Sequence, residues 1–186
     1  MAKVLITTIP FGDKDRFPLE LLETHGIEYL INPLNKKLSE NEFVEIVADY
    51  DVIIAGTEPI TKKVMDSASN LKMISRVGIG LDSVDLFEAE KQGITVSYTP
   101  DAPAPAVAEL TIGLMLSLLR SIHLSNMGMH RGKWHRFFGR RLSDVTIGII
   151  GVGRIGIGVL HHMQGFGSLK ILVNDISPNK NIEEQF

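Results

Sequence analysis

The sequence contains no cysteine among its 186 residues. Disulfides, thiol nucleophiles and cysteine-based metal sites are therefore excluded within it. It also lacks an excess of positive charge, because 19 lysines and arginines stand against 22 aspartates and glutamates and give a net charge of −3. Nucleic acids and anionic membranes are bound chiefly by basic surfaces, so we expect neither as a partner.

Long hydrophobic runs are lacking as well. The most apolar stretch, residues 112–119, lies between Glu109 and Arg120. It falls far short of the roughly 20 apolar residues that a membrane-spanning helix needs, so it predicts a buried helix instead. The chain enters a strand-like run at Val4 without the layout of a signal peptide. We expect a cytoplasmic protein whose 44% hydrophobic residues are enough for a core.

Short apolar or β-branched runs alternate with helical patterns in the first half of the chain. The expected strands cover residues 3–8, 27–31, 52–55, 73–77 and 95–97. Ser39 and Glu42 have the spacing of a helix-capping box, and Gly26 and Gly93 stand where helices should end. This alternation predicts an α/β fold with a doubly wound parallel sheet.

Prolines mark a change in composition near residue 100. Three of them lie within residues 99–105 and prevent a helix from starting before about residue 104. We place a domain boundary here, with one domain at residues 1–99 and a second at 100–186. Apolar residues on two faces then predict one long helix over residues 105–130, buried against a second domain or subunit, or wholly within a core.

The clearest functional signal is the turn that begins at Gly151. An apolar strand, residues 146–150, runs into Gly151, Gly153 and Gly156 in a G-x-G-x-x-G pattern, and a helical pattern follows. The glycine pattern alone is weak evidence, but a second strand, residues 170–175, ends in an acidic residue, Asp175. Together these features predict a dinucleotide-binding turn, although a glycine-rich turn without a ligand is the alternative.

Each part of this turn has a chemical role in such a site. The first glycine allows the tight turn, the second lets a pyrophosphate approach the backbone, and the third lets helix and strand pack closely. The N–H groups of Arg154 and Ile155 begin the helix and can bind an anion. Asp175 can accept hydrogen bonds from both ribose hydroxyls and would repel a 2′-phosphate, so NAD is favoured over NADP.

Six short segments extend this interpretation over nearly the whole chain. They are RVGIGLDSVD at 76–85, GITV at 93–96, TP at 99–100, VAEL at 107–110, RGKW at 131–134 and GVGRIG at 151–156. In this order they resemble the D-isomer-specific 2-hydroxyacid dehydrogenases, a group that includes phosphoglycerate, glyoxylate and formate dehydrogenase-like enzymes. The resemblance implies a flavodoxin-like substrate domain, followed by the first βαβ part of a Rossmann NAD-binding domain that is incomplete here.

The resemblance also implies roles for particular residues. Val77 and Gly78 would present backbone amides to the carboxylate of a small 2-hydroxy or 2-keto acid. Ile79 and Val107 would border the nicotinamide of NAD. The active site would lie between the two domains. Separately, the apolar faces of residues 105–130 lead us to expect a homodimer contact in that region.

The family's catalytic arginine, glutamate and histidine lie beyond the second Rossmann strand, and this sequence stops at Phe186 before any of them. The resemblance therefore implies no catalytic residue in this chain, and none of its six histidines has the catalytic position. Adjacent His161 and His162 would point about 100° apart on a helix, so they do not form a metal-binding pair. The alternative to an enzyme is a non-catalytic NAD-binding or dimerisation module of the same fold.

Two strands are few for a Rossmann sheet, which normally has six. Parallel strands are usually covered on both faces. We therefore expect the second half to expose apolar side chains, namely Ile147, Ile149, Ile150, Ile171 and Val173.

Overall fold

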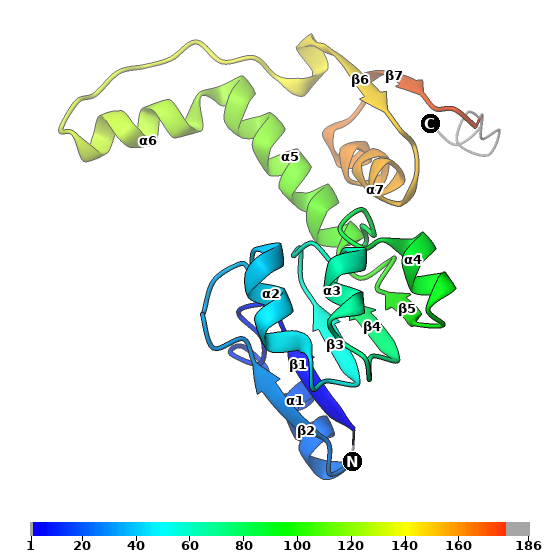
Figure 1. Cartoon of the computed structure of the whole chain (residues 1–186). Helices are drawn as coiled ribbons and strands as arrows, with labels where there is room; N and C mark the ends of the chain where they lie inside the picture. Colours follow the sequence, from blue (N-terminus) through cyan, green and yellow to red (C-terminus); the bar gives the residue numbers. More distant parts are fainter. Residues whose placement is uncertain (1, 178–186) are drawn as a thin grey trace. The chain divides into compact units, whose positions relative to one another are not determined.

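The computed structural model describes residues 2–177. Residues 178–186, which end the second expected domain, lie outside this range. The chain divides into two compact units, Met1–Pro100 and Asp101–Phe186, which we call unit 1 and unit 2. Both combine parallel strands with helices, so the predicted α/β class is confirmed (Figure 1).

Unit 1 is built on a five-stranded sheet. Its strands are β1 (Lys3–Ile6), β2 (Glu28–Ile31), β3 (Val52–Ala55), β4 (Met73–Arg76) and β5 (Thr95–Tyr98). All neighbouring strands are parallel, in the order β2-β1-β3-β4-β5. This is the flavodoxin-like order expected from the sequence, and each predicted strand ends within two residues of the observed one.

Four helices accompany this sheet. They are α1 (Phe17–Thr24), α2 (Glu40–Val47), α3 (Lys62–Asp66) and α4 (Leu86–Lys91). The capping box before α2 is confirmed: Ser39 Oγ accepts from the Glu42 N–H, and the Glu42 carboxylate accepts from the Ser39 N–H at 3.0 Å. Gly26 and Gly93 follow α1 and α4 with φ of +65° and +71°, the conformation that ends many helices.

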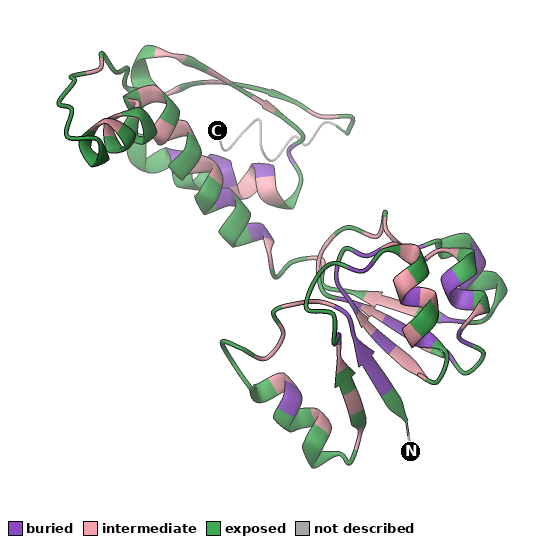
Figure 2. Ribbon diagram, turned by 60° about the vertical axis from the view of Figure 1, so that its left-hand side comes forward, coloured by how far each residue is buried: buried purple, intermediate pink, exposed green. Residues whose placement is uncertain are grey.

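The core of unit 1 lies mainly between the sheet and three of the helices. Its largest fully buried side chains include Phe43 of α2 and Met65 of α3, which pack in one cluster with Leu5, Ile53 and Ile74 of the strands. A smaller cluster joins α1 to the sheet through Leu19, Val4 and Ile6. Figure 2 shows the buried positions concentrated along the central strands and the inner sides of these helices. Each such side chain contributes about 1.5–3 kcal/mol by leaving water.

The described part of unit 2, residues 101–177, consists of one βαβ element preceded by two helices. Its elements are α5 (Ala104–Arg120), α6 (Ile122–His130), β6 (Thr146–Ile150), α7 (Arg154–Met163) and β7 (Lys170–Asn174), with short 3₁₀ turns at Leu142–Asp144 and Gln164–Phe166. Strands β6 and β7 are parallel, with Thr146 opposite Lys170. The predicted βαβ part is therefore confirmed.

The prediction of one helix over residues 105–130 is wrong. Ser121 has a left-handed backbone, with φ of 52°, and its N–H bonds back to the Leu118 carbonyl at 3.3 Å. This residue ends α5, and α6 leaves at an angle of 68°. Between residues 2 and 177, no single helix is long and apolar enough to cross a membrane; α5 and α6 reach that length and composition only as this bent pair.

The expected full burial of residues 112–119 is also wrong within the described chain. Ala104 and Ala108 are the buried residues of α5, whereas Leu110, Leu114 and Leu118 are 60%, 56% and 71% exposed. The helix packs on α7 at Ala108, whose Cβ lies 3.0 Å from where a Cβ on Gly158 would stand. One side of α5 therefore packs in the core of unit 2. Another side exposes Leu110, Leu114 and Leu118, which we call the leucine row.

The two-stranded sheet is covered on one face. Ile147, Ile149 and Ile171 are half-buried against Val159 and Met163 of α7. The expectation that these three isoleucines would be exposed is therefore wrong, because α7 and α5 cover them. Ile150 and Val173 are exposed as expected, at 90% and 43%, and Leu172 joins them at 60%.

Candidate functional site

The turn after β6 changes the direction of the chain within three residues. Gly151 has φ of +89°, a conformation that L side chains rarely adopt, and its N–H donates to the Asn174 carbonyl at 2.8 Å. Gly153 is the N-cap of α7, and its carbonyl accepts from the Ile157 N–H at 2.9 Å. The strand thus passes almost directly into the helix, as the glycine pattern predicts.

Protein packing explains the third glycine of the pattern. A Cβ on Gly156 would overlap the carbonyl oxygen of Gly151 and would stand 3.7 Å from Cγ2 of Ile149. Because the nearest neighbour is backbone, a side chain here would push α7 away from β6. The predicted role of Gly156 in close helix–strand packing is confirmed.

The second glycine is different, because packing does not require it. No heavy atom of residues 2–177 lies within 4 Å of the Cβ position of Gly153, and its φ of −83° is accessible to any residue. A side chain there would occupy space that the described protein leaves open. A pyrophosphate that approaches the backbone needs such space, so the turn fits the phosphates of a dinucleotide.

Asp175 lies directly beside this turn. Its Oδ2 accepts from the Val152 N–H at 2.6 Å, and its Oδ1 accepts from the Ser177 N–H at 2.9 Å. These two hydrogen bonds hold the pKa of the Asp175 carboxyl below its ordinary value, and the bond from Ser177 has the larger effect. The group is therefore a fixed carboxylate, and its remaining lone pairs can accept from the hydroxyls of a ribose.

The first turn of α7 carries Arg154 and Ile155. Their N–H groups belong to the helix N-terminus, where intrahelical acceptors are lacking and the helix dipole favours an anion. The Ile155 side chain packs in the core of unit 2, so only its backbone can face a ligand. Nε of Arg154 donates to Oδ1 of Asp101 at 2.5 Å, and both side chains are exposed. Sequence reasoning missed Asp101, because it lies 53 positions away.

In unit 1 the predicted substrate amides follow β4. The Val77 N–H donates to the Ala55 carbonyl at 2.9 Å, and the Gly78 N–H donates to Oγ1 of Thr99 at 2.9 Å. Both amides are therefore engaged within unit 1. A substrate carboxylate could take the Gly78 N–H only by replacing the Thr99 hydroxyl, a neighbour that sequence reasoning did not identify.

Arg76 packs underneath this turn. It is only 8% exposed, its Nη1 donates to the Val77 carbonyl, and its Nε is buried without a hydrogen-bond partner among residues 2–177. Gly78 has φ of +146°, and a Cβ on it would stand 2.6 Å from Arg76 Nη1. The backbone conformation therefore favours glycine at position 78, and a larger residue would also have to displace the Arg76 guanidinium.

A buried polar pair lies at the ends of two central strands. Thr7 follows β1 and Glu58 follows β3; both are almost wholly buried, and Oγ1 of Thr7 donates to Oε2 of Glu58 at 3.2 Å. In the order β2-β1-β3-β4-β5 the direction of winding changes between β1 and β3, and ligands of such sheets bind there. Sequence reasoning missed the pair because it assigned Thr7 to the strand.

The two residues expected at the nicotinamide belong to different units. Ile79 is half-buried in unit 1, and Val107 is 38% exposed on α5 in unit 2. Within residues 2–177, no group of three or more histidine, aspartate or glutamate side chains is arranged to hold a metal ion.

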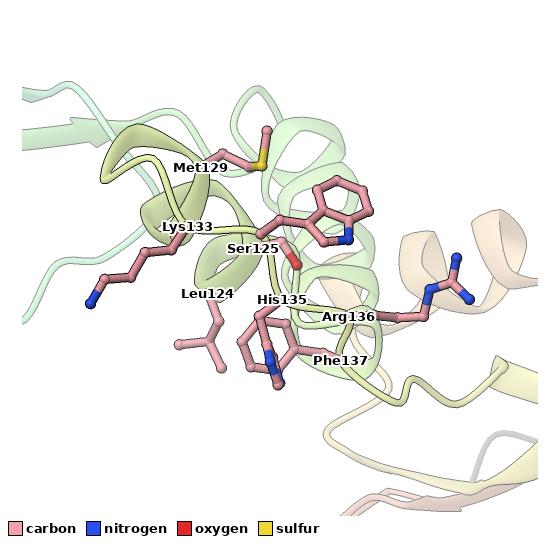
Figure 3. A pocket seen from close by; sticks show the side chains of 9 residues that line it. Leu124, Ser125, Met129, Lys133, His135, Arg136 and Phe137 are labelled. Carbon is pink, nitrogen blue, oxygen red and sulfur yellow. The ribbon is translucent and has the colours of Figure 1, made fainter.

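A hollow of about 380 Å³ lies along α6 in unit 2. It is bordered by Leu124 and Met129 of the helix and by the extended segment that carries Trp134, His135 and Phe137 (Figure 3). The rings of His135 and Phe137 meet edge to face, with centroids 4.5 Å apart. None of its lining residues belongs to the glycine turn, so this apolar hollow is separate from the dinucleotide site.

Comparison with known families agrees with this geometry. The model of the D-isomer specific 2-hydroxyacid dehydrogenase catalytic domain matches residues 11–177. The chain belongs to this family. It is 37% identical over 171 residues to D-3-phosphoglycerate dehydrogenase of Methanocaldococcus jannaschii, covering 90% of this chain and 31% of that protein. It is 34% identical over 155 residues to hydroxypyruvate reductase of Thermotoga maritima, covering 82% and 51%.

Solved structures superpose well on the chain. A Thermus thermophilus protein matches with a TM-score of 0.84 and 30% identity, over 95% of this chain and 57% of its own. The NAD⁺-bound 3-phosphoglycerate dehydrogenase of Entamoeba histolytica matches with a TM-score of 0.76 and 30% identity, over 100% and 59%. The chain thus spans between about a third and three fifths of the length of these relatives.

Proposed function

We propose that this chain provides the dinucleotide turn and part of the substrate site of an NAD-dependent 2-hydroxyacid dehydrogenase. The reaction would transfer a hydride between the nicotinamide C4 and the C2 of a 2-hydroxy or 2-keto acid. The observation that carries the proposal is the open space at Gly153, which packing does not explain, next to the fixed carboxylate of Asp175. Two relatives named for 3-phosphoglycerate or hydroxypyruvate support this class of substrate.

NAD would be held chiefly by unit 2. The space at Gly153 and the N–H groups of Arg154 and Ile155 would receive the pyrophosphate, and Asp175 would receive the ribose hydroxyls. Ile79 and Val107 would border the nicotinamide, as the family resemblance implies. The cofactor supplies the hydride chemistry, while these residues bind and orient it.

The substrate carboxylate would be held at the turn after β4. The Gly78 N–H would exchange the Thr99 hydroxyl for a carboxylate oxygen, and the Val77 N–H would add a second, shared bond. The Arg76 guanidinium lies beside Gly78 and bonds to the Val77 carbonyl in this turn. Its positive charge would therefore stabilise the added carboxylate. Charge-assisted hydrogen bonds to backbone N–H groups make such an exchange favourable.

The proton-transfer groups of the family would come from outside this chain. The resemblance puts the family's arginine, glutamate and histidine beyond the second Rossmann strand, and the chain spans only about a third to three fifths of the length of its relatives. We therefore infer that the chain by itself binds ligands without turning them over, and that it is the amino-terminal portion of such an enzyme. In keeping with the sequence, we also infer a cytoplasmic protein.

A non-catalytic NAD-binding or dimerisation module of the same fold is the second candidate, and an exposed apolar surface supports the association that both candidates share. Leu110, Leu114 and Leu118 form an exposed row on α5, and Trp134 and Phe138 are 79% and 102% exposed beyond α6. Large exposed apolar patches mark protein contacts. We infer that a second copy of the chain covers this region, in either an enzyme or a module.

The experiment that tests the proposal replaces Gly153 by valine and measures NAD binding by calorimetry. Valine would fill the open space and block the pyrophosphate, so we expect NAD binding to be lost. The matched control is Gly148→Val in β6, where no heavy atom of the described chain lies within 4 Å of the Cβ position and a β-branched residue suits the strand. Unchanged NAD binding in Gly153→Val would remove this turn from the cofactor site.

A further inference from the structure

A second hollow in unit 2, of about 370 Å³, lies at the end of α5. Three arginines line it: Arg120, the last residue of α5, and Arg140 and Arg141 from the segment before β6. Ser143 adds a hydroxyl, and Phe166 adds an aromatic ring. The hollow shares no lining residue with the glycine turn.

The three arginines differ in how their charge is balanced. Arg141 forms a two-point contact with Asp144, through Nη2 to Oδ1 at 2.9 Å and Nε to Oδ2 at 3.2 Å. This contact holds the Arg141 side chain in place. Among residues 2–177, neither Arg120 nor Arg140 forms an ion pair or a side-chain hydrogen bond. Two positive charges therefore face the hollow without compensation from the described protein.

Backbone contacts bring these two arginines together. The Arg140 N–H donates to the Leu119 carbonyl at 3.0 Å, which fastens the segment before β6 to the end of α5. The Arg120 side chain runs alongside Gly139, where a Cβ would stand 2.9 Å from Arg120 Nε. Glycine at 139 thus leaves room for the guanidinium beside Arg140.

The sequence around the hollow is strongly basic, although the whole chain is acidic. Residues 110–143 contain six lysines and arginines and no aspartate or glutamate, whereas the net charge of the chain is −3. The nearest acids along the chain are Glu109 and Asp144, and Asp144 is already paired. Such local segregation creates a positive potential that attracts anions.

We propose that this hollow binds a small anion that carries a phosphate group. Arginine presents planar, bidentate donors that match phosphate oxygens. Ser143 Oγ donates to Asp144 Oδ1 over a long 3.4 Å and can turn this hydrogen to the anion instead. The Phe166 ring, 42% exposed, offers a flat apolar wall for the rest of such a molecule. A second copy that packs on the leucine row need not cover this hollow. Arg120 follows Leu118 by about 200° of rotation around the axis of α5, so the two side chains lie on nearly opposite sides of the helix.

The test titrates inorganic phosphate into the purified chain by calorimetry, with sodium chloride holding the ionic strength constant. We expect one saturable site in the parent chain. Arg120→Gln and Arg140→Gln should each weaken binding by about tenfold, the usual effect of losing one charge-assisted contact. Arg131→Gln is the matched control, because Arg131 is exposed after α6 and does not line the hollow.

Three results would overturn the proposal. Phosphate binding that does not saturate, or that is weakened equally by Arg131→Gln, would mean that it depends only on the overall positive charge of this region. A loss of phosphate binding in Arg154→Gln with no loss in Arg140→Gln would place phosphate at the glycine turn instead.

Arg140→Lys separates a lost contact from a structural defect. It keeps the charge but not the planar fork, so we expect it to bind phosphate more tightly than Arg140→Gln. Equal weakening in Arg140→Lys and Arg140→Gln, with melting temperatures below that of the parent, would show a structural defect rather than a lost contact.

Discussion

The Asp175 carboxylate accepts a hydrogen bond from the Val152 N–H at 2.6 Å. Val152 lies between the first two glycines of the turn, and Asp175 follows the neighbouring strand β7. One hydrogen bond therefore joins the residue expected at the ribose to the turn expected at the pyrophosphate. A change at Asp175 should affect both parts of the proposed cofactor site.

We predict that Asp175→Ala weakens NAD binding by about tenfold or more and reduces discrimination against NADP. The substitution removes the acceptor for the ribose hydroxyls and the charge that repels a 2′-phosphate. Calorimetric titrations with NAD and NADP measure both effects. Asp144→Ala, in the same unit but paired with Arg141 away from the turn, should leave the preference unchanged. Equal affinity of the parent chain for NAD and NADP would contradict the role given to Asp175.

The sequence predicts the strands and the glycine turn because their determinants are local. Apolar runs of four or five residues define β3 and β6 to the residue, and Ser39 and Glu42 define the start of α2. The break at Ser121 has no such signal, since neither glycine nor proline stands there and a left-handed serine is uncommon.

The missed parts of the candidate sites depend on distant contacts. Thr7 meets Glu58 from 51 positions away, because β1 and β3 are neighbours in the sheet. Asp101 meets Arg154 from 53 positions away. Periodicity and spacing report which residues share an element, and they do not report which elements meet.

The capping box of α2 should make stability depend on pH. Hydrogen bonding to Lys36 and to the Ser39 backbone lowers the pKa of Glu42 to about 2. A lowered pKa in the folded state stabilises the fold above the ordinary pKa of 4.5, and this advantage is lost as pH falls through about 2. We predict that Glu42→Gln lowers the urea midpoint at pH 7 and that the difference from the parent disappears near pH 2.

Glu45→Gln is the control for this measurement. Glu45 lies on the same helix and forms no ion pair or side-chain hydrogen bond within residues 2–177. Its urea midpoint should follow that of the parent at every pH. A constant difference between Glu42→Gln and the parent from pH 7 to pH 2 would show that the Glu42 charge does not support the cap.

Gly156 and Gly153 should respond differently to the same substitution. We predict that Gly156→Ala destabilises unit 2 by about 1–3 kcal/mol, because the new Cβ meets the backbone of Gly151. Gly153→Ala should unfold like the parent, since its Cβ position is open. Thermal unfolding followed by circular dichroism compares the two. Similar losses of stability in both variants would mean that packing requires both glycines.

The purified chain should not oxidise 2-hydroxy acids at an ordinary enzymatic rate. Its proposed site contains the cofactor-binding turn and the substrate-binding amides but not the family's acid–base residues. Losing such residues lowers the rate by a factor of about 10²–10⁴. The assay follows NADH absorbance with several 2-hydroxy acids, and NAD binding by calorimetry verifies that the site is intact. NADH formation at a normal rate would show that the catalytic groups lie within these residues.

The outer face of unit 2 should determine how the chain associates. Ile150 and Leu172 leave one face of the two-stranded sheet apolar and exposed, and a row of leucines is also exposed on α5. We predict a dimer by light scattering that Leu114→Gln and Leu118→Gln convert to monomer. Leu34→Gln, at a 44% exposed leucine of unit 1, should leave it dimeric. If the parent is instead a monomer, its amides from residue 146 to 175 should exchange quickly, because parallel strands that are covered on one face only open easily. A dilute monomer with strong protection over these residues would contradict both outcomes and would mean that this βαβ element is stable without a partner.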